Sequence, residues 1–524
     1  TGTKAAAHYR LTVPAGGSAR VRLRLSAAPA ADDPPGEAFG AAFAAQLTQR
    51  REEADAFYAS VAPPELQGTD AAGVMRQALA GMLWSKQYYY FDVDRWLEEH
   101  EGHPARVLKR LNVRNRDWFH MLNDDVISMP DKWEYPWYAA WDLAFHAVAL
   151  AMIDLDFAKE QLELMLRELY LHPNGQIPAY EWNFGDVNPP VHAWATLFVF
   201  RTEQERRGRG DLRFLRRAFH KLLVNFTWWV NRKDPGGRNV FEGGFLGLDN
   251  IGVFDRSAPL PTGGHLEQAD GTAWMALFAQ NMLEMALLLA VDDPLYEDFA
   301  LKFLEHFLWI ASAMDRIGDN QDELWDEADG FFYDVLRLPD GSAQRLKVRS
   351  MVGLLPLCAT TVIDLEVADR FPRLRERMER FLRLHPRLQS TIAPLDRPGV
   401  KGRRLLGALN EPKLRRVLAY LLDEGEFLSP HGVRALSRYH AGRPYVLQLA
   451  GQEYRVDYQP AESSSPLLGG NSNWRGPVWF PMNALLIRAL LNLYVCYGDE
   501  FTVECPTGSR RHLTLFEVAR EISD

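Results

Sequence analysis

Hydrophobic side chains recur with a helical period over most of the chain. In the stretches with this pattern, apolar residues return every three or four positions and so share one face of a helix. The predicted helices span residues 38–61, 70–87, 138–152, 156–170, 190–207, 211–232, 269–291, 294–315, 363–383, 411–423 and 476–497. A chain dominated by such segments is expected to be all-α. No repeat of fixed period is visible, so an irregular ring of helices is favoured over a regular solenoid.

The first 26 residues follow a different pattern. Val21, Leu23 and Leu25 alternate with arginines, which is the two-residue period of a half-buried strand. A Pro-Ala-Gly-Gly turn at 14–17 precedes them. Two strands alone are not stable in water, so we expect them to pack on the helical domain, on another chain or on a further β domain. Residues 27–37, rich in Ala, Pro and Asp, are predicted to be a linker.

Composition narrows the functional classes. The chain has 524 residues, 47% of them hydrophobic and 24% charged, as in ordinary globular proteins. A net charge of -10 without a basic stripe argues against nucleic-acid binding. Three cysteines without CxxC spacing argue against structural zinc and disulfides, and a reducing, cytoplasmic location is expected. No run of 18 uncharged apolar residues predicts a membrane span, and nucleotide-binding and zincin motifs are lacking.

Long loops rich in aromatic and acidic residues carry the candidate chemistry. Residues 175–190 place Glu181 and Asp186 among aromatics, and a carboxyl group in apolar surroundings has the raised pKa that a general acid needs. The plain alternative for Asp186 is a helix N-cap. Trp137, Trp141 and Asp142 open a helix and could form a platform for a sugar ring, although Asp142 also suits a helix N-terminus.

Two further loops add polar groups. Asp249, Asn250, Asp255, Arg256, Gln268 and Asp270 between 243 and 274 could bind hydroxyl groups or, less favoured, calcium. The segment 457–479 contains Glu462 beside Trp474, Arg475 and Trp479. Glycoside hydrolysis needs two carboxyl groups, one as acid and one as base or nucleophile. The loops around Asp186 and Glu462 each offer one.

At this level of detail the chain resembles glycoside hydrolase family 63. The matching runs are Trp-Asn-Phe-Gly-Asp-Val-Asn-Pro-Pro at 182–190, Tyr-Pro-Trp and Trp-Asp at 135–142, Asn-Trp-Arg-Gly-Pro-Val-Trp at 473–479, and the segment 427–437. The resemblance covers about residues 60–500. It implies an (α/α)6 barrel over 38–524, a remnant of an N-terminal β-sandwich at 1–26, inversion at an α-linked sugar, and no cofactor or metal.

The resemblance also implies residue roles. Asp186 would be the general acid and Glu462 the general base, with Glu453 or Asp457 as alternative bases. The predicted substrate-binding residues are Trp137, Trp141, Asp142, Trp182, Asn183, Asp249, Asp270, Trp474, Arg475 and Trp479. The only partner expected is the carbohydrate substrate.

Several functions remain open at this stage. The favoured one is an inverting, exo-acting α-glucosidase on a small glucoside or oligosaccharide. A glucosylglycerate or mannosylglycerate hydrolase is the alternative within the family, because the 182–190 run matches that branch and the Trp-Arg-Gly run matches the other. Two functions other than glycoside hydrolysis are also open. One is a sugar epimerase, for which His146, His192 and His265 are candidate acid/base groups. The other is a non-catalytic carbohydrate-binding protein.

Overall fold

The computed structural model describes the chain except for residues 1–4, 26, 28–37, 106–112, 131–136, 182–183, 316–321, 365–369, 390–391, 394–397 and 462–471. The chain divides into two compact units, Thr1–Ala80 and Gly81–Asp524. The predicted start of a catalytic domain at residue 38 stays a prediction.

The first unit has little buried surface. It contains helix α1 (Ala41–Val61), the short 3-10 helix η2 (Pro64–Leu66) and most of α2 (Asp70–Trp84), and α1 buries none of its side chains. Residues 5–25 form no strand; a turn closes with the Gly17 amide donating to the Pro14 carbonyl at 2.9 Å, and apolar side chains such as Leu23 are exposed. The predicted strands are therefore absent here, because a strand forms only where a second one accepts its backbone hydrogen bonds.

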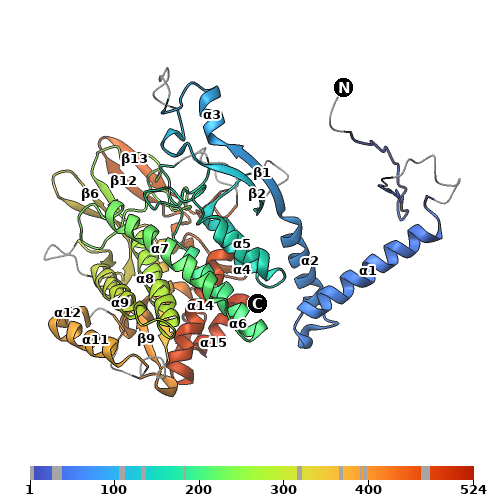
Figure 1. Cartoon of the computed structure of the whole chain (residues 1–524). Helices are drawn as coiled ribbons and strands as arrows, with labels where there is room; N and C mark the ends of the chain where they lie inside the picture. Colours follow the sequence, from blue (N-terminus) through green and yellow to red (C-terminus); the bar gives the residue numbers. More distant parts are fainter. Residues whose placement is uncertain are drawn as a thin grey trace. The chain divides into compact units, whose positions relative to one another are not determined.

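The second unit is built from helices that pack in successive pairs (Figure 1). Helix α4 packs on α5, α6 on α7, and α8 on α9, while α4, α6 and α8 also lie next to one another. The bounds are α3 Val93–Glu99, α4 Ala140–Leu150, α5 Leu155–Leu164, α6 His192–Arg207, α7 Leu212–Arg232, α8 Ala269–Ala290, α9 Tyr296–Ala313, α11 Pro372–Leu384, α12 Pro386–Gln389, α13 Glu411–Leu421, α14 Phe480–Tyr497 and α15 Leu515–Ser523.

Most predicted helices are confirmed to within a few residues, and local capping explains several of their ends. Asp154, Asp211 and Asn410 cap α5, α7 and α13 by accepting backbone N–H groups of the first turn. The prediction for 363–383 is wrong at its start, since 360–363 is a strand and α11 begins at Pro372. Helix α15, which has a capping box at Thr514, was not predicted.

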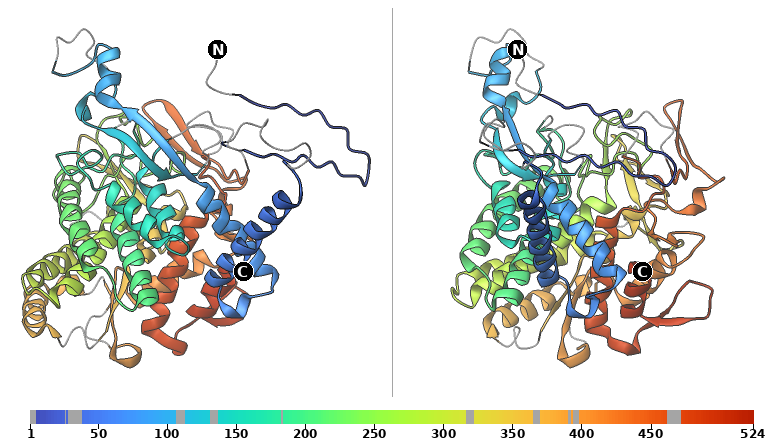
Figure 2. Two further views of the ribbon diagram at one scale, coloured as in Figure 1. Left: turned by 45° about the vertical axis from the view of Figure 1, so that its right-hand side comes forward. Right: turned by 90° about the vertical axis from the view of Figure 1, so that its right-hand side faces the viewer.

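The strands are short and pair antiparallel in small sheets. They are β1 Lys86–Asp92, β2 Leu122–Ser128, β3 His265–Glu267, β4 Trp325–Asp326, β5 Phe331–Phe332, β6 Asp334–Arg337, β7 Ala343–Leu346, β8 Thr360–Ile363, β9 Arg404–Gly407, β10 Leu428–Ser429, β11 Gly432–Val433, β12 Tyr445–Leu449, β13 Gln452–Val456, β14 Thr502–Glu504 and β15 His512–Thr514. Strands β6, β12 and β13 lie at one end of the helices, and α11 and α12 lie at the other (Figures 1 and 2).

Helix α8 forms the centre of the core. All but one of its residues are buried, against one large apolar cluster of the second unit. By length and composition α8 and the 480–500 segment are apolar enough to cross a membrane, but 94% of the α8 window is buried inside the protein, as in a core helix. The segments that precede α4, α6, α8 and α14 contain the predicted site residues, so the start of these helices decides where those residues meet.

Candidate active site

The loop that carries Asp186 is tied to the start of α4 by backbone hydrogen bonds. The Ala140 amide donates to the Ala179 carbonyl at 2.9 Å, and the Ala179 amide donates to the Asp186 carbonyl at 3.3 Å. Gly175 turns the loop with φ +97, and a Cβ there would meet the Val224 carbonyl oxygen at 2.7 Å. The loop is therefore fixed on both α4 and α7.

Asp186 is a buried carboxyl group, 7% exposed. Burial raises its pKa, opposed by hydrogen bonding from the hydroxyl groups of Ser257 and Tyr180; the latter donates at 3.5 Å. The negative charge of Asp255 raises the pKa of Asp186, and the positive charge of Lys233 lowers it. A raised pKa is the direction that suits a carboxyl group to protonate a leaving oxygen.

Asp249 lies close enough to Asp186 for their charges to interact. It is 8% exposed, and burial raises its pKa to about 6 while the Ser472 hydroxyl lowers it. The loop that bears Asp249 passes close to Trp141 at Gly247, which has φ +68. A Cβ at this position would lie 2.5 Å from the Trp141 ring. The structure thus brings the predicted residues Asp186, Asp249 and Trp141 together.

Three tryptophans form one aromatic surface beside these carboxyl groups. Trp474 and Trp479 stack with ring centroids 4.2 Å apart, and Trp141 lies 6.0 Å from Trp474. The indole N–H of Trp479 donates to the Asn473 carbonyl at 2.9 Å, whereas the buried indole N–H of Trp474 has no partner in the described structure. Flat indole faces with a free donor are suited to a sugar ring.

Asn250 joins the two loops that meet at this surface. Its side-chain oxygen accepts the Trp474 amide at 2.7 Å, and its backbone carbonyl accepts Arg475 Nε at 2.7 Å. Arg475 also donates to the Gly252 carbonyl at 3.3 Å, and burial lowers its pKa. Much of the hydrogen-bonding capacity of Arg475, predicted to bind substrate, therefore holds backbone in place.

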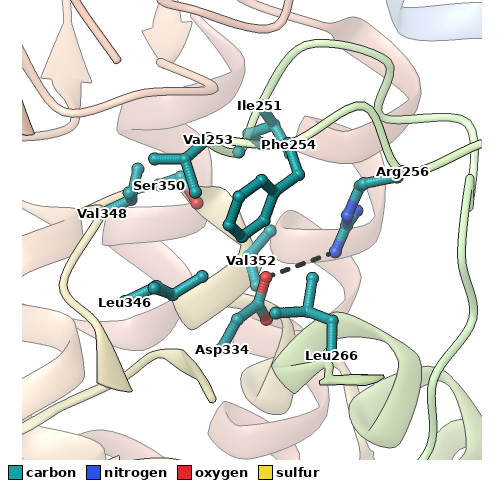
Figure 3. A pocket seen from close by; sticks show the side chains of 11 residues that line it. Ile251, Val253, Phe254, Arg256, Leu266, Asp334, Leu346, Val348, Ser350 and Val352 are labelled. Carbon is teal, nitrogen blue, oxygen red and sulfur yellow. Dashed lines mark ion pairs between the residues drawn. The ribbon is translucent and has the colours of Figure 1, made fainter. Parts of the chain in front are cut away.

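Asp270, also predicted to bind substrate, is occupied by a protein partner. It is fully buried, and its two oxygens accept the two terminal nitrogens of Arg256 at 2.8 and 2.7 Å. Arg256 reaches Asp334 at 3.5 Å as well, across a small cavity of about 20 Å³ with mostly apolar walls (Figure 3). This ion pair engages both oxygens of Asp270, and its predicted role in substrate binding stays a prediction.

The remaining predicted residues fall into two groups. Trp137 donates its indole N–H to the Pro130 carbonyl at 2.9 Å and packs on a smaller apolar cluster, and Asp142 lies half-buried in the first turn of α4. Trp182, Asn183 and Glu462 lie outside the described residues. Their predicted roles stay predictions.

The two alternative bases have surroundings that suit neither to the task. Glu453 is exposed on the β12–β13 hairpin and accepts a hydrogen bond from Gln448 at 2.8 Å. Asp457 is paired with Arg455 Nε at 2.7 Å.

Glu181, five residues before the candidate acid, is enclosed by aromatic groups. It is 1% exposed, accepts the Tyr138 amide at 3.2 Å and faces the Tyr89 hydroxyl. Burial raises its pKa to about 7. Glu181 therefore connects the Asp186 loop to the segment that leads into α4.

Histidine acid/base chemistry finds no support in these surroundings. Burial lowers the pKa of both His146 and His192 to about 4, and burial with nearby arginines lowers that of His265. Among the described residues, no group of three or more His, Cys, Asp or Glu side chains could hold a metal ion.

Lys233 and Glu242, which the sequence pattern did not single out, complete the site together with Asp255, which it did. Lys233, Glu242 and Asp255 line a cavity of about 230 Å³ next to Asp186. Lys233 follows directly on α7, where a lysine is usually a solvated helix end, and Glu242 lies in a glycine-rich loop. No local signal distinguishes them from surface residues.

Comparison with known proteins identifies a family whose model matches the segment that contains Asp186 and Asp249. Residues 135–250 match the family model of the mannosylglycerate hydrolase MGH1-like glycoside hydrolase domain. The protein YMR196W of Saccharomyces cerevisiae, described as uncharacterized, is 48% identical over 99% of this chain. The chain spans about half, 49%, of that relative.

Solved structures show a more distant likeness. The GH63 mannosylglycerate hydrolase from Thermus thermophilus, in complex with Tris, aligns with 70% of this chain and 83% of its own at 15% identity and a TM-score of 0.43. Its glucose complex aligns over 70% and 82%, at 16% identity and a TM-score of 0.42. These likenesses are too distant to argue from. The segment with Asp186 and Asp249, matched on sequence, belongs to the MGH1-like glycoside hydrolase domain family, so the chain carries a glycoside hydrolase domain.

Proposed function

We propose that this protein is an inverting α-glycoside hydrolase, most simply an exo-acting α-glucosidase on a small glucoside or oligosaccharide. The observation that carries the proposal is the buried Asp186, which lies next to Asp249 in the site and whose pKa is raised by desolvation. In this proposal Asp186 protonates the leaving oxygen. Glu462 takes a proton from the water that attacks the anomeric carbon.

The scaffold of the proposal is an (α/α)6 barrel. The side-by-side packing of α4, α6 and α8, each paired with an outer helix, supports this arrangement. The tryptophan surface of Trp141, Trp474 and Trp479 would bind the sugar whose bond is cleaved, together with Asp249. The alternation of residues 9–25 supports a β domain that precedes the helices, in which these residues would find partner strands.

A second candidate is hydrolysis of a glycosyl-glycerate. The half-buried Lys233 beside Asp186 favours it, since an ammonium group could bind a carboxylate of the leaving group. The printed name of the matching family model points the same way.

The test is release of glucose or mannose from α-glucosides, α-mannosides and glycosyl-glycerates, with the first-formed anomer detected by NMR. Release of the β-anomer by the wild type, lost in Asp186→Asn, is expected. If the α-anomer is released first, the enzyme retains the anomeric configuration and the proposed inverting mechanism is wrong. Among Glu462→Gln, Glu453→Gln and Asp457→Asn, only the first should abolish release; loss in one of the others alone would reassign the base.

A further inference from the structure

The cavity next to Asp186 has the position of a leaving-group subsite. It measures about 230 Å³ and is lined by residues 254–256 and 258–260 on one side. Ser257, between these lining residues, interacts instead with the Asp186 carboxyl group. A general acid protonates the oxygen of the departing group, so that group must lie beside the acid. The small volume suits one ring or a three-carbon unit rather than a long chain.

The charges that line this cavity do not favour an anion. Lys233 is the cation near Asp186, but Glu242 and Asp255 also line the cavity. None of the three forms an ion pair within the part of the chain that the structure describes, so all are available to a ligand. One ammonium group therefore faces two carboxylates.

The other basic groups of the lining are occupied or neutral. Arg256 has its two terminal nitrogens on Asp270, at 2.8 and 2.7 Å. His265 lies 3.6 Å from Glu267, and burial with Arg238 and Arg337 lowers its pKa. Neither adds a free positive charge to the cavity.

Its remaining walls suit a polyol or a sugar. Phe254, Leu260 and Leu266 supply apolar surface, while both polar atoms of the Gln268 side chain are hydrogen-bonded to the Gly244 backbone. Carboxylates accept hydrogen bonds from hydroxyl groups, and such charge-assisted bonds are stronger than neutral ones. A carboxylate in the ligand would instead meet two like charges.

We propose that this cavity binds the leaving group, and that it selects a neutral, hydroxylated group over one that bears a carboxylate, with Glu242 and Asp255 accepting its hydroxyl hydrogens. The inference rests on the proposed function, since it assumes hydrolysis at Asp186. It decides between the two substrate candidates in favour of the neutral one.

Glucosylglycerol and glucosylglycerate, with their mannosyl counterparts, provide a matched test, because the pair differs only by a hydroxymethyl group in place of a carboxylate. We expect wild-type kcat/KM to be at least about tenfold higher for the glycerol compound. Glu242→Gln should reduce that preference by about tenfold, the effect of one charge-assisted hydrogen bond. Glu424→Gln, an exposed carboxylate in the loop after α13, is the control and should preserve the preference.

A glycosyl fluoride, whose leaving group needs no such subsite, separates the two hypotheses. If the fluoride is hydrolysed but glycerate is preferred over glycerol, and Lys233→Met removes that preference, the inference is overturned while the proposed function stands. If neither the glucosyl nor the mannosyl fluoride is hydrolysed, both fail.

Discussion

Two neighbouring regions of the second unit contain buried carboxyl groups in opposite surroundings. Around Asp186 and Asp249, burial is the largest influence on the carboxyl groups and raises both pKa values. In the other region, the buried Asp270 accepts two guanidinium hydrogen bonds from Arg256, and the buried Glu267 accepts two from Arg337 and one from Arg238. Asp249 lies in the loop before α8 and Asp270 in the first turn of α8, so sequence distance does not separate the two kinds.

The difference indicates which carboxyl groups are arranged for chemistry. A paired carboxylate stays charged and holds elements together, whereas an unpaired one in a desolvated site can exchange a proton near neutral pH. Asp334 has features of both kinds of carboxyl group. It shares the Arg256 guanidinium with Asp270 at a longer distance, and burial raises its pKa.

The strongest test of this contrast is Asp186→Asn. We expect kcat on an α-glycoside to fall by about 10²–10⁴-fold, the usual contribution of a general acid. The thermal unfolding midpoint should stay equal or rise slightly, because a desolvated carboxyl group is removed. An equal loss of activity and stability would place Asp186 with the paired, structural carboxylates.

Arg256→Met should show the opposite pattern, with a loss of stability as its main effect. It leaves the fully buried Asp270 without its partner, and breaking a buried pair costs about 3–5 kcal/mol. Urea unfolding should show this loss of stability. The double variant Arg256→Met, Asp270→Leu should recover part of the lost stability. If Asp270→Asn abolished activity in a protein of unchanged stability, Asp270 would bind substrate after all.

Glu181→Gln tests an unpaired carboxyl group through pH. Its pKa is about 7 in the folded protein against 4.5 for the ordinary group. Between these values the folded state keeps a proton that the unfolded state releases, so the contribution of Glu181 to stability is present below pH 4.5 and lost as pH rises through 7. The loss amounts to about 3 kcal/mol.

The free energy of unfolding should therefore decrease less between pH 5 and pH 8 for Glu181→Gln than for the wild type. The amide can still accept the Tyr138 N–H, which makes the variant a conservative one. An identical decrease in both proteins would mean that Glu181 is ionised throughout this range.

The smallest effect is expected for Glu453→Gln. This exposed hairpin residue should change kcat/KM by less than about twofold and stability by less than about 0.5 kcal/mol. A large loss of activity would identify a third kind of carboxylate, exposed in this structure but required in the reaction.

The sequence by itself determined the helices, the loops that bear the chemistry and the identity of Asp186 as the candidate acid. Helices such as α7 and α8 are encoded locally, by apolar period and by capping residues, so a single segment contains the information. The strand pattern of residues 9–25 was equally local but did not form strands, because strands depend on a partner.

Only the tertiary structure decided which acidic residues are paired. Asp249 and Asp270 look alike in the sequence, yet one faces Asp186 and the other faces Arg256. Lys233 and Glu242 enter the site because the end of α7 and the loop after residue 240 converge there. The pKa of a carboxyl group depends on burial and on charges from distant segments, and no local pattern encodes these.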